Sequence, residues 1–283
     1  MTSGAGETSL ASVVEIASEH VGEQNHRFVV ALGDGASVEA VLYRGDSLCV
    51  STQVGCAVRC PFCASGANGL ARNLTLDEIV GQIELVRRSA ATLGRVTFSG
   101  IGEPLHNASA VRDAIQWCRD NGLAPSLTTS GGPTRRLREA LRWPHNGLTV
   151  SVHAGTDAVR ARLVPEGPPL DELFAVLGDE LASLGTRRRK KLALAYLLVA
   201  SDNDSDSELD AFASRATALS IAVHLYAYNP VPTSGARPVP RARYEQAWQR
   251  LRDRGLLVRM SSTARTEGNG GCGTLVALRR GVA

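Results

Sequence analysis

The sequence predicts an α/β protein built on an open, partial parallel barrel of six βα units, (βα)6, with a small N-terminal extension. After residue 46, short apolar strands alternate with amphipathic helices, and polar or glycine residues follow the strand ends. A closed barrel of this type needs eight units, so six units predict an open one. We therefore expect an extension at residues 1–45 and a barrel core at residues 46–283.

The individual elements follow from local sequence patterns. The extension is predicted to contain one helix at residues 9–20 and a hairpin with turns at GDG (33–35) and RGD (44–46). The core opens with the strand SLCVSTQ, followed by a helix within residues 73–89, where apolar residues recur at helical spacing and Thr75 with Glu78 forms a capping box. Further strands are predicted at 95–99, 125–130, 148–152, 191–199, 222–228 and 256–260. Further helices are predicted near 108–120, 134–142, 170–184, 206–219 and 240–253.

Composition limits the class of protein. The chain has 283 residues, 43% of them hydrophobic and 21% charged, which is typical of a soluble globular protein. No apolar run approaches the ~18 residues of a membrane span, and the first residues lack the pattern of a secretory signal. We therefore expect a cytoplasmic protein with no membrane partner, whose cysteines stay reduced as metal ligands or reactive thiols.

Charge is a weaker guide. The net charge of +3 comes mostly from local runs such as TRRRKK at 186–191. Runs of this kind are more often solvated helix ends than nucleic-acid contacts. Charge alone leaves both interpretations open.

The most informative segment is CVSTQVGCAVRCPFCASG at residues 49–66. Cys56, Cys60 and Cys63 form a C-x3-C-x2-C pattern, and such a trio of thiolates can hold three corners of a 4Fe–4S cluster. A structural zinc site would need a fourth ligand, and the chain has no partner pair of cysteines or histidines elsewhere. A role in core packing suits three cysteines within eight residues poorly. The pattern favours an iron–sulfur cluster with one open iron.

This spacing, at the end of the first strand of a βα barrel, resembles the radical S-adenosylmethionine (SAM) superfamily. Further motifs resemble, in order, the RlmN and Cfr enzymes, which methylate C2 or C8 of an adenosine in RNA. The match extends from about residue 38 to residue 276. Its motifs are LCVSTQVGCAVRCPFCASG, TFSGIGEPLHN, TTSGG, VSVHAGTDAVRARLVP, YNP and CGTL.

The resemblance implies a radical SAM methyltransferase that uses a 4Fe–4S cluster and SAM. It assigns the cluster to Cys56, Cys60 and Cys63. The positions that match the family's SAM contacts are Gly102, Glu103, Ser130, Ser151, Val152, His153 and Asn229.

Two further thiols match the family's covalent chemistry. Cys272 matches the cysteine that one SAM methylates and whose methyl group then loses hydrogen to the radical from a second SAM. Cys49 matches the cysteine that resolves the resulting protein–substrate adduct by attacking the methylcysteine sulfur. Glu39 matches the carboxylate that takes the ring proton. Cys118 has no counterpart and is expected to pack in the core.

Three hypotheses for function remain open. In the first, adenosine in ribosomal or transfer RNA is methylated, and residues 187–191 and 135–142 help to hold phosphates. In the second, the same chemistry acts on a small heteroaromatic or nucleoside-like molecule, because the family's N-terminal RNA-binding domain is missing or reduced here and EGNGG (267–271) replaces an acidic run. In the third, the cluster belongs to a non-catalytic iron–sulfur binding protein. Both catalytic hypotheses require an electron donor such as flavodoxin or ferredoxin.

Overall fold

The chain folds around one mixed sheet, seen in a computed structural model that describes residues 13–267 and 273–277. The ten strands follow the order β1-β2-β3-β4-β7-β8-β9-β10-β11-β12. From β4 onward neighbouring strands are parallel. These strands are β4 (Ser47–Val50), β7 (Arg95–Phe98), β8 (Ala124–Thr129), β9 (Gly147–Ser151), β10 (Leu192–Leu198), β11 (Ala222–Ala227) and β12 (Val258–Met260). The order has two free edges, so the predicted open barrel is confirmed.

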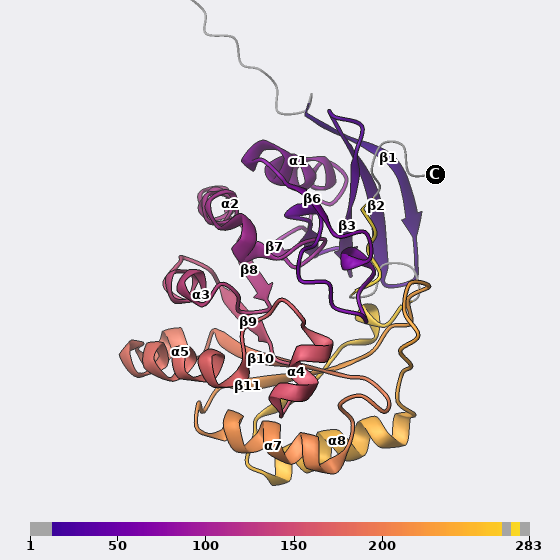
Figure 1. Ribbon diagram of the computed structural model, residues 1–283. Coiled ribbons are helices and arrows are strands. Elements are labelled where there is room, and N and C mark those ends of the chain that lie inside the picture. Colours follow the sequence, from indigo (N-terminus) through magenta and orange to yellow (C-terminus); the bar gives the residue numbers. More distant parts are fainter. Residues whose placement is uncertain (1–12, 268–272, 278–283) are drawn as a thin grey trace, which may run out of the picture.

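Helices connect the parallel strands and cover the outer side of the curved sheet (Figure 1). They are α1 (Leu76–Arg87), α2 (Ala108–Asp120), α3 (Thr134–Ala140), α4 (Asp157–Leu163), α5 (Leu170–Ser183), α6 (Thr186–Arg189), α7 (Asp206–Thr217) and α8 (Arg241–Asp253). All six predicted helices of the core and the capping box of Thr75 and Glu78 are confirmed. The helices α4 and α6, of seven and four residues, were not predicted because each is too short to show a helical period.

The two faces of the parallel strands differ in chemistry. Residues facing the helices, such as Val96, Phe98 and Leu127, are apolar and fully buried. Alternate residues, such as Thr97, Ser126 and Thr128, face the inside of the barrel and are only partly buried. The barrel therefore has a dry outer core against the helices and a polar interior.

The extension consists of three antiparallel strands, β1 (Val14–Val21), β2 (Asn25–Leu32) and β3 (Ser37–Tyr43). The predicted hairpin is confirmed, with positive φ angles at Gly35 and Gly45 in its turns. The predicted helix at 9–20 is wrong wherever the structure describes it, because β1 pairs with β2 from Val14 to Val21. Pairing with a neighbouring strand outweighed local helix propensity. Since β3 also pairs with β4, the extension continues the sheet of the core.

Candidate active site

The three clustered cysteines lie in a loop closed by a two-stranded ribbon that was not predicted. Its strands are β5 (Gln53–Gly55) and β6 (Leu70–Asn73). At the neck of the loop, Gly55 has a φ of 81°, and a Cβ atom there would lie 1.9 Å from the carbonyl oxygen of Gly69. The amide of Cys56 donates to that same oxygen at 3.2 Å. Glycine is therefore required at the neck, and the ribbon fixes where the cysteine loop begins.

All three cysteine side chains of the loop are partly exposed. Burial, together with the charges of Glu103 and Cys63, raises the pKa of Cys56 to about 12. Burial also raises the pKa of Cys60, as do Cys63 and Cys56. Because each thiolate disfavours its neighbours, ionisation of the group requires a bound positive charge, which metal ions supply.

The loop offers three cysteine thiols as donors to a metal site. Within residues 13–267 and 273–277, no three His, Cys, Asp or Glu side chains converge closely enough to ligate one metal ion. A 4Fe–4S cube binds each thiolate through a different iron, so its ligands stand further apart than those around one zinc ion. The thiols of Cys56, Cys60 and Cys63 match this donor set.

Next to the loop, the segment after β7 is held very close to β4 and β5. A Cβ atom at Gly100 would lie 2.8 Å from the carbonyl oxygen of Val50, and one at Gly102 would lie 2.6 Å from the Cβ of Gln53. Gly102 also has a φ of 106°. Only glycine fits at both positions, and the pair brings Glu103 to the edge of the sheet.

The Glu103 carboxylate is buried and joins the end of β7 to the end of β8. It accepts hydrogen bonds from Thr129 Oγ1 at 2.5 Å, from the Ser130 amide at 2.7 Å and from the Leu105 amide at 3.0 Å. A carboxylate has about four acceptor positions, so capacity for one further donor remains. The interaction of Glu103 with the ammonium group of SAM stays a prediction.

A buried arginine that sequence reasoning missed holds the ends of β8 and β9 together. Arg160, on α4, is only 1% exposed. Its guanidinium donates to four backbone carbonyls, those of Ser130, Ser151, Val152 and Pro168, at 2.7 to 3.2 Å. Three of these carbonyls belong to predicted SAM contacts. The available signal was a basic residue beside the apolar pair Val159 and Leu163 on one helical face.

His153 is fixed in one neutral form. Its Nδ1 accepts a hydrogen bond from the Leu197 amide at 3.0 Å, so the ring proton lies on Nε2. Burial, together with the charge of Arg160, lowers the pKa of His153 to about 3. The backbone φ of 58° is held by Asn203, whose Nδ2 donates to the His153 carbonyl at 2.8 Å. His153 can therefore donate a hydrogen bond at physiological pH but cannot act as a cation.

These strand ends surround a cavity of about 150 Å³ inside the mouth of the barrel. Its polar wall residues are Ser99, Thr128, Ser151, His153, Tyr226, Tyr228 and Arg265, together with Cys63 of the cysteine loop. None of the described residues that line it carries a carboxylate. Within the described part of the chain, the hydroxyl groups of Tyr228 and of nearby Ser130 are buried without a hydrogen-bond partner. A wall of donors with unsatisfied hydroxyls fits a polar, acceptor-rich ligand.

The three predicted chemical residues differ in their relation to this cavity. Cys49 is buried, and its Sγ lies 3.2 Å from the Oγ of Ser99, which is part of the wall. Cys272 lies outside the described residues. The residue that follows it, Gly273, lines the cavity and accepts a hydrogen bond from the Ala64 amide of the cysteine loop at 2.9 Å.

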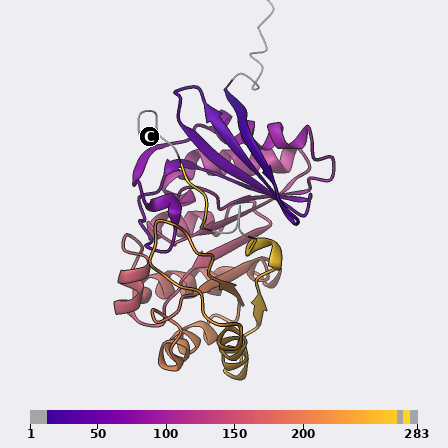
Figure 2. The same ribbon diagram turned by 90° about the vertical axis from the view of Figure 1, so that its right-hand side faces the viewer.

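Glu39 is committed to other groups. Its carboxylate accepts from Arg27 Nη1 at 3.1 Å and from the Val276 amide at 2.8 Å. Figure 2 shows this last described segment, in yellow, beside the indigo N-terminal strands. Burial raises the pKa of Glu39, partly opposed by these two donors. The carboxylate anchors the segment after Cys272, and its predicted role as proton acceptor is not tested by this geometry.

Asn229 has a similar anchoring contact. Its Nδ2 donates to the carbonyl of Arg265 at 2.7 Å. The Arg265 guanidinium lies 5.3 Å from the ring centroid of Tyr43 and 5.9 Å from that of Tyr226. Arg265 thus places a cation in the cavity wall between β3 and β11, which no local sequence pattern indicated.

Comparison with known proteins agrees with this geometry. Residues 50–216 match the family model of the radical SAM superfamily. A probable RNA methyltransferase of Bordetella avium is 35% identical over 280 residues, covering 96% of this chain and 78% of the relative. The dual-specificity RNA methyltransferase RlmN 1 of Myxococcus xanthus is 40% identical over 192 residues, covering 62% of this chain and 52% of the relative. The crystal structure of a radical SAM methyltransferase from Sphaerobacter thermophilus superposes with a TM-score of 0.83 at 29% identity, covering 93% of this chain and 81% of that one.

The fold and site define a radical SAM enzyme. The chain belongs to the RlmN/Cfr-like methyltransferases of the radical SAM superfamily. Its cofactors are accordingly a 4Fe–4S cluster and SAM. The hypothesis of a non-catalytic iron–sulfur binding protein is therefore wrong. Among the described residues, no helix combines the length and the apolar composition needed to cross a membrane.

Proposed function

We propose that this enzyme methylates a ring carbon of an adenosine in RNA, through a methyl group carried on Cys272. Its relatives from Bordetella avium and Myxococcus xanthus are named as RNA methyltransferases. The observation that carries the proposal is the docking of the segment after Cys272. Gly273 bonds to the cysteine loop and lines the same cavity as Cys63. The proximity of Gly273 to the cysteine loop supports the proposed role of its neighbour in the sequence, Cys272.

The cofactors supply the radical when bound, and the chain supplies ligands and positioning. Cys56, Cys60 and Cys63 hold the cluster in this proposal. Gly102, Glu103, Ser130, Ser151, Val152, His153 and Asn229 surround SAM, with the Nε2 proton of His153 available to a SAM acceptor. Arg160 keeps the carbonyls at the strand ends occupied, so that none of them faces the ligand unpaired.

The thiols complete the reaction. Cys49, behind the wall residue Ser99, attacks the methylcysteine sulfur once the substrate carbon is bound. Before this attack the adduct would lose one electron, which the oxidised cluster would accept, and the ring proton. As the Cys49–Cys272 disulfide forms, the bond between the Cys272 sulfur and the transferred carbon breaks, and that carbon keeps the electron pair and takes a proton to become the methyl group of the product. A reductant then opens the disulfide. Burial raises the pKa of Glu39, the proposed acceptor of the ring proton, above its ordinary value, which makes the carboxylate a stronger base. We place this reaction in the cytoplasm with flavodoxin or ferredoxin as electron donor.

The test is methylation of unmodified RNA by matched cysteine variants. Cys272→Ala is expected to give no methyladenosine while keeping the cluster chromophore. Cys118→Ala is the control, because Cys118 lies fully buried on α2, away from the cavity wall. It is expected to keep both product and chromophore. Methyladenosine formed by the Cys272→Ala enzyme would overturn the proposed role of Cys272.

A further inference from the structure

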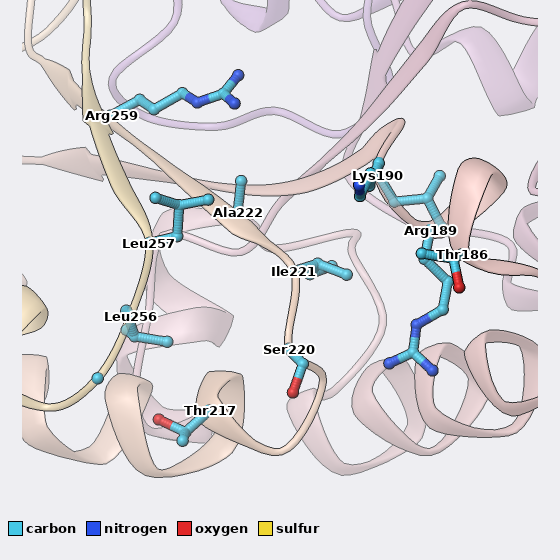
Figure 3. A pocket seen from close by; sticks show the side chains of 12 residues that line it. Thr186, Arg189, Lys190, Thr217, Ser220, Ile221, Ala222, Leu256, Leu257 and Arg259 are labelled. Atoms are coloured by element: carbon cyan, nitrogen blue, oxygen red, sulfur yellow. The ribbon is translucent and has the colours of Figure 1, made fainter.

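A second, larger cavity lies at the opposite rim of the barrel, where β10, β11 and β12 begin (Figure 3). Its volume is about 810 Å³. Figure 3 shows Arg259 on one side and Lys190 and Arg189 on the other, with the apolar Ala222 and Ile221 between them. Among residues 13–267 and 273–277, no carboxylate contributes to its wall. The cavity is thus a cationic cleft with an apolar floor.

These cations differ from the other basic residues of the chain. On α3, Arg138 forms ion pairs with Asp179 and Glu180, and Arg142 forms one with Glu180. Among the described residues, no ion pair joins Arg189, Lys190 or Arg259 to an acidic side chain. The predicted phosphate contacts at 135–142 are therefore largely neutralised, whereas the cleft keeps its charge.

The basic residues at 187–191 also differ from one another in their contacts. Arg188 donates to the carbonyls of Leu141 and His145 and acts as a structural tie between α3 and α6. Lys190 is exposed and makes no such contact within the described residues. Arg259 is exposed as well, on the edge strand β12, so the cleft collects cations from two separate elements. Low-dielectric walls around charges of one sign concentrate their field in the cleft.

The cleft continues into the barrel. An interior cavity of about 270 Å³ shares Lys190 and Arg259 with it and adds Lys191 and Arg265. The same interior cavity shares Arg265 and Tyr226 with the active-site cavity. Burial lowers the pKa of His224 in this interior, and Arg259 and Arg265 lower it further. The positive field therefore extends from the active site to the opposite rim.

We propose that this cleft binds backbone phosphates of the RNA substrate at a distance from the methylated nucleotide. This inference rests on the proposed function. Cations distributed over α6 and β12 suit a polymer that passes along the rim better than a single phosphate group held at one point. The side chains of Leu257 and Met260, next to Arg259, are 63% and 45% exposed and offer apolar surface to bases or riboses.

The distance between the two rims sets the length of RNA that is needed to contact both. The seven residues of β10 separate the two rims by roughly 20 Å at ~3.3 Å per residue. RNA that reaches both rims must therefore run for several nucleotides along the open side of the sheet, past β12. Phosphate contacts of this kind fix the position of the RNA without reading its sequence.

The salt dependence of RNA binding tests the cleft directly. The variant is Lys190→Ala with Arg259→Ala, and the matched control is Arg87→Ala with Arg88→Ala, an exposed basic pair at the end of α1. Fluorescently labelled, unmodified transfer RNA and ribosomal RNA transcripts serve as probes in anisotropy titrations from 50 to 200 mM salt. Two lost phosphate contacts lower the slope of log K against log salt by roughly 1.4 to 1.8. The control pair is expected to keep the wild-type slope.

A parallel methylation assay on the same transcripts separates the two proposals. An unchanged slope in the cleft variant, with RNA still methylated by the wild type, overturns the inference and leaves the proposed function intact. Wild-type enzyme that neither binds nor methylates either RNA overturns both. Inorganic tripolyphosphate that binds the wild type but not the cleft variant, without any change in the RNA slope, assigns the cleft to a small anion and also overturns the inference.

Discussion

The two rims of the parallel sheet hold their charges in opposite ways. At the rim of the active site, Glu103 and Arg160 are buried and engage backbone amides and carbonyls through fixed hydrogen bonds. At the other rim, Lys190 and Arg259 are exposed, and no acidic side chain of the described part of the chain lines their cleft. Buried charges of the first kind require complete hydrogen bonding, whereas exposed charges of the second kind cost little to keep unpaired.

This difference indicates two tasks. A rim that is fixed in advance suits a small cofactor and a reaction in which atoms must be placed closely. An exposed cationic rim suits a flexible polyanion whose phosphates can adapt to it. Changes at the first rim should therefore abolish chemistry or stability, and changes at the second should alter RNA affinity alone.

The largest effect is expected from the cluster ligands. Replacing Cys60 by Ala should remove the brown chromophore and all methyl transfer. Only two protein thiolates then remain to ligate the cluster, and one further iron loses its protein ligand. Cys118→Ala should keep the chromophore, since Cys118 is fully buried and distant from the loop in the sequence. Absorption spectra after anaerobic reconstitution provide the measurement. A complete cluster in the Cys60→Ala protein would mean that the ligand assignment is wrong.

Replacing Cys49 should also abolish the release of methylated product, but at a later step of the reaction. Without the resolving thiol, the adduct between Cys272 and the substrate has no partner for release. Cys49→Ala should therefore accumulate a covalent protein–RNA species, seen as a shifted band on a denaturing gel after one turnover. Cys49→Ala enzyme recovered free of RNA, with methylated product released, would contradict the role.

The stability of the active-site rim should depend on Arg160. Arg160→Met leaves four buried carbonyls without a donor, and each abandoned acceptor costs about 1–3 kcal/mol. We expect a loss of at least about 3 kcal/mol in the free energy of unfolding, measured by urea denaturation. Arg162→Met, on the same helix with a side chain 54% exposed, is the control and should change stability by less than about 0.5 kcal/mol. Equal losses of unfolding free energy in the Arg160→Met and Arg162→Met variants would contradict the structural role of Arg160.

A smaller effect is expected from pH. Burial lowers the pKa of both His145 and His153 to about 3, below the ordinary value of 6.5. Between these values the unfolded chain binds protons that the folded chain excludes, so stability rises with pH across this range. Melting temperature should therefore fall as the pH is lowered from about 6.5 to 4. His145→Phe should reduce this fall, and a variant as acid-sensitive as the wild type would contradict the assignment to His145.

Local patterns in the sequence predicted much of the fold. Helical periodicity and the capping box at Thr75 located α1, and alternation with apolar strands located the parallel sheet. The strand β1 was missed because its pairing with β2 does not follow from its own residues. Local propensity describes a segment in isolation, while strand pairing depends on a neighbour.

The features of the candidate site also fall into two groups, those visible as sequence motifs and those that depend on contacts between distant residues. The spacing of Cys56, Cys60 and Cys63 and the glycine at 102 were visible as motifs. The four carbonyl contacts of Arg160, the Nε2 proton of His153 and the position of Arg265 between two tyrosines were not. Each of these depends on residues from distant elements that meet only in the folded chain. Their charges and hydrogen bonds had to be read from the structure.

The central claim is that a methyl group passes from SAM through Cys272 to an adenosine of RNA. An anaerobic turnover with SAM carrying a CD₃ methyl group, followed by digestion of the RNA and mass spectrometry of the nucleosides, tests it most directly. We predict methyladenosine that retains two of the three deuterium atoms, because one is lost when the methyl group on the Cys272 sulfur becomes a carbon-centred methylene radical. Methyladenosine with all three deuterium atoms, or a labelled Cys272 without any labelled nucleoside, would contradict it.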